Sequence, residues 1–187
     1  MGRKNLSDIR RLEIVQGFAR VFSRHGFAKA TIVDAAHEAG LAPALLHHYF
    51  ESKQAILTAL VTQLAKGVQA RIETHLESDR DLLTSYFAAV LQTGPRADLQ
   101  AAKCWVGIFA EGIADASLGK LVRQFVAQQL AMLARIAPKL TPPQRAAIVA
   151  YVIGCLVFGA FAPSGYAGFA FPQAQVIADA FMRQARA

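Results

Sequence analysis

Side chains that could carry out catalysis or bind a metal are few in this chain, and their spacing is unfavourable for both. His47 and His48 are adjacent, but neither has a His or Cys partner three or four residues away to build a zinc site. Cys104 and Cys155 lie far apart without CxxC or Cys/His spacing, which is typical of buried, reduced cysteines. No Gly-rich phosphate loop, HExxH or GxSxG motif occurs. We therefore expect no metal site, no cofactor and no enzymatic activity.

Binding to an anionic partner is a better fit to the charge. The formal net charge is +7 and the isoelectric point is near 9.8. A short basic arm opens the chain, with Arg3, Lys4, Arg10 and Arg11 against Asp8. Such an arm is compatible with contacts to nucleic-acid phosphates, although a frayed, solvated terminus has the same composition.

The elements that would position these residues are all helical, because apolar residues recur at helical spacing and alternating patterns are nearly absent. The first helix is expected to bury Leu12 together with Val15, Phe18, Ala19 and Phe22. We predict about nine helices, at residues 7–24, 31–39, 43–49, 53–76, 79–93, 97–114, 117–137, 142–162 and 173–186.

The second and third of these helices have the spacing of a helix-turn-helix motif. Thr31 can cap the second helix, with Asp34 in the acidic position of a capping box. Gly40 permits the tight turn, and Ser52 caps the fourth helix. The third helix would present to a DNA major groove the side chains of Pro43, Ala44, Leu45, His47 and His48.

The run from Thr31 to Leu57, TIVDAAHEAGLAPALLHHYFESKQAIL, resembles the DNA-binding signature of the TetR family of transcriptional regulators. The resemblance implies that Thr31, Tyr49 and Lys53 contact DNA phosphates, while the outward residues of the third helix read base edges. It also implies an all-α fold, with a helix-turn-helix domain at residues 1–60 and a ligand-binding and dimerisation bundle at residues 61–187. The chain departs from the usual pattern at three positions, namely Ala42, Leu45 and His47.

The middle helices are the expected ligand sensor. Their aromatic residues, together with one acidic group, could line an apolar pocket that favours a cation, or they could be ordinary core. The Trp-containing helix and the HisHisTyrPhe run resemble the choline-responsive, BetI-like branch, whereas the region around Gly154 lacks that branch's acidic residue. The candidate ligand-binding residues are Tyr86, Trp105, Phe109, Glu111 and Phe125.

The chain carries no charged residue between Arg145 and Asp179. One explanation is a transmembrane helix at residues 146–162, and the function would then be that of a membrane-associated helical interaction protein. The other is a helix buried against a second copy, with a homodimer formed through residues 142–186. We favour the second, and expect a cytoplasmic repressor that a small molecule releases from a palindromic, double-stranded DNA operator.

Overall fold

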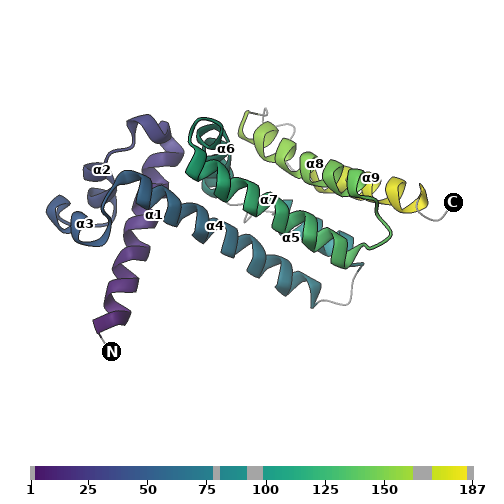
Figure 1. The fold of residues 1–187 in the computed structure, drawn as a ribbon, viewed down its shortest axis with the longest axis horizontal. Helices are drawn as coiled ribbons and strands as arrows, with labels where there is room; N and C mark the ends of the chain where they lie inside the picture. The colour runs from purple at the N-terminus through teal and green to yellow at the C-terminus, as the bar shows by residue number, and fades with distance from the viewer. Residues whose placement is uncertain (1–2, 78–80, 92–98, 162–169, 185–187) are drawn as a thin grey trace.

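The computed structural model describes residues 3–77, 81–91, 99–161 and 170–184, and within these ranges it contains nine α-helices and no strand (Figure 1). The side chains of residues 3–5 lie outside what is described, as do residues 94–96 and 163–169, which fall between helices predicted from the sequence. The helices are α1 (Arg3–Lys29), α2 (Ile32–Glu38), α3 (Pro43–Tyr49), α4 (Lys53–Leu76), α5 (Leu82–Leu91), α6 (Leu99–Ala114), α7 (Ala116–Ile136), α8 (Pro142–Phe161) and α9 (Ala170–Gln184).

The predicted all-α fold is confirmed, with two corrections in α1. The helical segment runs from Arg3 to Lys29, and Gly26 interrupts it with φ 74°, a backbone conformation that glycine adopts without strain. Leu12 is 46% exposed rather than buried, because the buried stripe of α1 includes Ile14 and Val21 and is rotated away from Leu12.

Helix α9 also begins earlier than predicted. It starts at Ala170 rather than at residue 173, and Pro172 therefore lies in the first turn of the helix. A proline is tolerated there because the first amides of a helix have no intrahelical acceptor.

Side-chain caps define where α2, α4 and α7 begin. Thr31 Oγ1 accepts a hydrogen bond from Asp34 N at 3.0 Å, and Ser52 Oγ accepts one from Ala55 N at 3.1 Å, as the sequence predicts. Asp34 does not complete a capping box, because its carboxylate instead accepts the Thr31 hydroxyl at 2.6 Å. Asp115 caps α7 in the same way.

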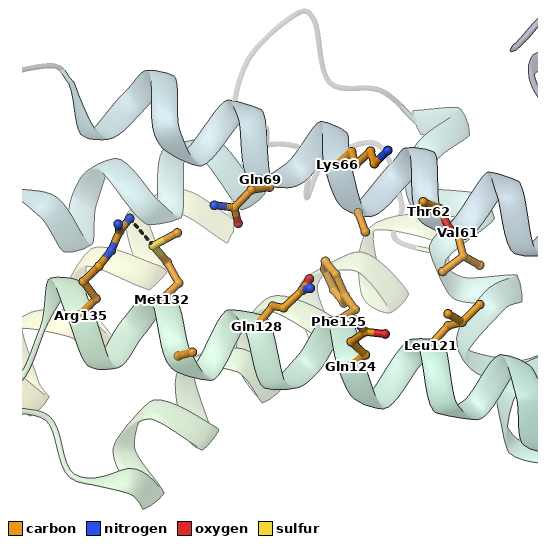
Figure 2. Close-up of a pocket in the computed structure, with 12 residues that line it drawn as sticks. Val61, Thr62, Lys66, Gln69, Leu121, Gln124, Phe125, Gln128, Met132 and Arg135 are labelled. Atoms are coloured by element: carbon orange, nitrogen blue, oxygen red, sulfur yellow. Dashed lines mark hydrogen bonds between the residues drawn. The ribbon is translucent and has the colours of Figure 1, made fainter. Parts of the chain in front are cut away.

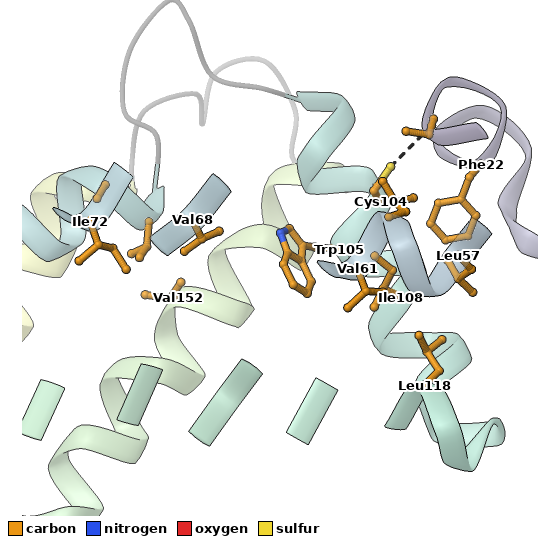
Figure 3. Close-up of a cluster of buried hydrophobic side chains, with 14 of the residues drawn as sticks. Phe22, Leu57, Val61, Val68, Ile72, Cys104, Trp105, Ile108, Leu118 and Val152 are labelled. Carbon is orange, nitrogen blue, oxygen red and sulfur yellow. Dashed lines mark hydrogen bonds between the residues drawn. The ribbon is translucent and has the colours of Figure 1, made fainter. Parts of the chain in front are cut away.

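The helix-turn-helix segment and the bundle share one hydrophobic core (Figure 3). Helix α6 packs against α1 closely: a Cβ atom on Gly107 would lie only 2.6 Å from Phe22 Cζ. Cys104 Sγ lies 3.6 Å from the Ala19 carbonyl oxygen (Figure 3). Cys104 and Cys155 are buried and form no disulfide with each other, as predicted. Because α1 packs directly against α6, a shift of α6 would displace α1 as well.

Candidate nucleic-acid interface and ligand cleft

Helix α3 is held by one face and leaves the other in solvent. Leu46 is completely buried, and Phe50 just after the helix is 3% exposed. Pro43 is half-buried, while the outward side chains are exposed, namely Ala44, Leu45, His47 and His48. The sequence predicts that these residues read base edges, and the structure places the four exposed side chains on one accessible surface.

Helix α1 supports the end of α3. The Arg11 guanidinium lies over the Phe50 ring, 4.2 Å from its centroid, and donates a hydrogen bond to the Tyr49 carbonyl oxygen. The Tyr49 ring is half-buried and meets the His48 ring edge-on at a centroid distance of 5.3 Å. Arg11 therefore contributes to the orientation of α3, a role that its place in the basic arm does not predict.

The residues predicted to contact phosphate are engaged within the protein itself. The Thr31 hydroxyl donates to Asp34, and Lys53 Nζ donates to the Phe27 carbonyl oxygen at 2.8 Å while lying over the Phe27 ring. An ammonium group has three donors, so these contacts leave Lys53 able to reach a phosphate. Lys53 also ties the start of α4 to the segment that links α1 and α2.

Two arginines of α1 hold one carboxylate of α2. Arg20 Nε lies 2.7 Å from Glu38 Oε2, and Arg24 Nη2 donates to Glu38 Oε1. The hydrogen bond from Arg20, followed by that from Arg24, holds the pKa of Glu38 below its ordinary value of 4.5. This cluster was not predicted, because its members lie 14 and 18 residues apart in the sequence.

A cleft of about 560 Å³ opens between α4 and α7 (Figure 2). From α4 it is lined by Val61, Thr62, Ala65, Lys66 and Gln69. From α7 the lining includes Leu121, Gln124, Phe125, Gln128, Met132 and Arg135. Its volume is within the range of small-molecule sites.

The structure brings together three of the five predicted ligand-binding residues. Trp105 stacks on Phe125 at a centroid distance of 4.3 Å and on Phe109 at 5.6 Å, and Phe125 also lines the cleft. Tyr86 is buried instead, 3.3 Å from Gln129 Oε1, and burial raises the pKa of its hydroxyl. Glu111 is half-buried near the end of α6 and is not among the described lining residues.

Comparison with known proteins identifies the helix-turn-helix segment. The family model for bacterial regulatory proteins of the tetR family matches residues 14–60. A BetI transcriptional regulator from Brucella anthropi is 24% identical over 165 residues, covering 86% of this chain and 84% of that protein. Residues 14–60 therefore match the DNA-binding segment of the TetR family, and the chain as a whole is similar to a BetI regulator.

Solved structures of the same fold match about nine-tenths of the chain. A transcriptional regulator from a Rhodococcus species has a TM-score of 0.83 at 15% identity and covers 93% of this chain and 96% of its own. A regulator from Saccharomonospora viridis, solved in complex with choline, has a TM-score of 0.71 at 17% identity, with coverages of 90% and 93%. The chain thus shares the fold of these two proteins over both its helix-turn-helix segment and its bundle.

Helix α8 is long and apolar enough to cross a membrane when judged by length and composition alone. In this structure, however, it packs against α6 and α7, and its inner residues Ile148, Val149 and Val152 are buried. The match of residues 14–60 to the tetR family model, and the similarity to a BetI regulator, also count against the membrane-associated alternative.

Proposed function

We propose that this protein is a cytoplasmic, homodimeric repressor of the TetR family that binds a palindromic operator and leaves it when a small molecule occupies the α4/α7 cleft. The DNA-binding part of this proposal is supported mainly by the exposed surface of α3. His47, His48 and Leu45 would meet base edges, with Pro43 and Ala44 at the start of the helix. Thr31, Tyr49 and Lys53 would contact phosphates and set the register.

The second copy is proposed from the outer face of α8. Ala146, Ala150, Gly154, Val157 and Phe161 are all exposed in the single chain and recur at helical spacing, so they form one apolar stripe. A Cβ atom on Gly154 would meet nothing within 4 Å, which leaves room for a neighbouring helix to approach. A stripe of this kind indicates an interface, and α9 lies beside it to complete a four-helix contact with the partner.

Helix α4 is proposed to transmit the ligand signal. It begins at Lys53, just after α3, and its residues 61–69 line the cleft. Near its start, Gln54 Nε2 donates to Asp115 Oδ2 at 2.9 Å, which ties α4 to the beginning of α7. A ligand that separates α4 from α7 would move the two recognition helices of the dimer away from their spacing of about 34–36 Å on DNA. The division into domains at residue 60 falls inside this helix.

Selection of bound duplexes from a random pool, at moderate salt, tests this function. Enrichment of a short palindrome supports a dimeric operator-binding protein. A folded, soluble sample that enriches nothing, or enriches only a single half-site, argues against the proposal. The enriched duplex then serves as the probe for release by small molecules.

A further inference from the structure

The α4/α7 cleft is positively charged. Lys66 lies on its rim and Arg135 at one end, and none of the described residues that line the cleft is acidic (Figure 2). Both side chains are exposed to solvent. A site with two cations and no lining carboxylate favours an anionic ligand over a cationic one.

The apolar residues of the cleft are separated from Arg135 along its length. In Figure 2 Val61 and Leu121 lie at the end opposite Arg135, and Phe125 projects between the two helices. Val61 is 2% exposed, so this end of the cleft has a packed hydrophobic floor. A ligand with a charged head and an apolar tail matches this arrangement.

The Arg135 guanidinium is in a position to receive the head group. Its Nη2 atom lies 3.2 Å from Met132 Sδ, and a thioether is a weak acceptor that a carboxylate readily replaces. Gln128 projects into the cleft between Arg135 and Phe125 and can donate a further hydrogen bond. Glu73, four residues after Gln69 on α4, is not one of the lining residues, and its carboxylate accepts a hydrogen bond from Gln69 Nε2 at 2.8 Å.

We propose that the effector of this regulator is a small amphipathic carboxylate, with its head group on Arg135 and its tail along Phe125 towards Val61 and Leu121. The inference rests on the proposed function, whose ligand site it specifies. The proposed carboxylate differs in charge from choline, the cationic ligand bound by the Saccharomonospora viridis neighbour. A quaternary ammonium is stabilised by aromatic faces and a carboxylate, and here Glu111 stays away from the cleft.

The single tryptophan of the chain provides a direct measurement of binding. Trp105 stacks on Phe125, which lines the cleft, so a tail that touches Phe125 changes the environment of the indole. Octanoate is the probe, and octyltrimethylammonium, octanol and choline are compared with it in separate titrations of the full-length protein. We expect a saturable fluorescence change with octanoate that is clearly tighter than with the other three compounds.

Arg135→Gln should weaken octanoate binding about tenfold or more, because a charge-assisted hydrogen bond is lost, while Arg135→Lys should retain part of the affinity. The control is Arg123→Gln, which removes an exposed charge from the same helix outside the cleft and should leave binding unchanged. The proposal is overturned if the alkylammonium or choline binds tighter, if octanoate does not bind, or if Arg135→Gln and Arg123→Gln behave alike.

Operator binding without ligand, measured on the same variants, separates this proposal from the proposed function. If the protein binds DNA specifically but shows no preference for octanoate, the proposed carboxylate effector is refuted and the proposed regulatory function still stands. Loss of specific DNA binding in the parent protein would refute the regulator itself, whatever the fluorescence titrations show.

Discussion

At the residue scale, Lys53 and His48 represent the two kinds of DNA contact that we propose. Lys53→Gln should weaken binding to all duplexes about equally, because a phosphate contact carries no sequence information, and it should reduce the salt slope by about one. His48→Ala should change the preferred sequence and leave the salt slope nearly unchanged. Both are measured by titrating the selected operator and a single-base variant at several salt concentrations.

The structure supplies a necessary control for Lys53, since its ammonium also binds the Phe27 carbonyl oxygen. Thermal unfolding of Lys53→Gln separates a weakened fold from a lost phosphate contact. If the Lys53 and His48 variants had the same sequence preference and the same salt slope, the division between backbone and base contacts would be incorrect.

Glu38 gives a prediction about pH. Its pKa is lowered in the folded protein, chiefly by the hydrogen bond from Arg20, so its stabilising contribution is present above its ordinary pKa of 4.5. That contribution is lost as the pH falls through the lowered value. Glu38→Gln should therefore reduce the melting temperature at neutral pH, and the difference from the parent should shrink towards pH 3. A difference that is constant between these pH values would show that the ion cluster does not stabilise α1 against α2.

At the element scale, the crossing of α1 and α2 depends on Gly17. A Cβ atom there would lie 2.7 Å from the Ala35 carbonyl oxygen and 3.0 Å from Ala39 N, which are backbone atoms that cannot move aside independently. We expect Gly17→Ala to destabilise the protein by about 1–3 kcal/mol, the usual cost of overpacking. Chemical denaturation, followed by circular dichroism, measures this change.

Gly67→Ala is the matched control for Gly17. Gly67 also lies inside a helix, but its added Cβ would meet only Arg71 Nη1 at an ordinary 3.6 Å. Because alanine is the better helix former, this variant should gain up to about 1 kcal/mol. Opposite signs for the two glycines would assign the loss at Gly17 to the helix crossing, whereas a gain in both would contradict the close approach of α1 and α2.

The helices themselves could be predicted from local patterns in the sequence. Thr31 and Ser52 begin helices because their hydroxyls bind amides three residues away, and Gly40 permits the turn with φ 68°. These interactions span a few residues, so spacing alone identifies them. Local patterns do not predict which face of a long helix is buried, because that depends on the partners that pack against it. Leu12, predicted to be buried but exposed in the structure, is an example.

The ligand cleft could not be predicted in the same way. Its walls are two helices about 60 residues apart in the chain, and neither Lys66 nor Arg135 has a local pattern that marks it as lining. The sequence instead favours, as ligand-binding residues, aromatic residues at helical spacing within α6. Two of these, Trp105 and Phe109, stack behind Phe125, so only Phe125 of the five predicted residues reaches the cleft.

At the scale of the whole molecule, the proposed binding to a palindromic operator needs two recognition helices and therefore two copies of the chain. The shared core of α1 and α6 and the Gln54–Asp115 hydrogen bond link α4 to the bundle within one copy. They hold α3 relative to the bundle, and the α8 stripe would then set the distance between the two α3 helices of the proposed dimer. Ligand binding at the cleft and operator binding at α3 would weaken each other, because both depend on the position of these connected helices.

Val157→Glu tests the dimer, because Val157 is 40% exposed in the single chain and lies within the α8 stripe. A carboxylate there can stay solvated in the monomer but would be buried without a partner in the dimer, which costs several kcal/mol. We expect sedimentation to show a monomer, with operator affinity reduced about a hundredfold or more while the helical circular dichroism is preserved. Ile113→Glu is the control: Ile113 is 90% exposed at the end of α6, away from the stripe, so the dimer should remain. A Val157→Glu protein that stays dimeric would place the interface elsewhere, and the spacing of the α3 helices would then be set by a different surface.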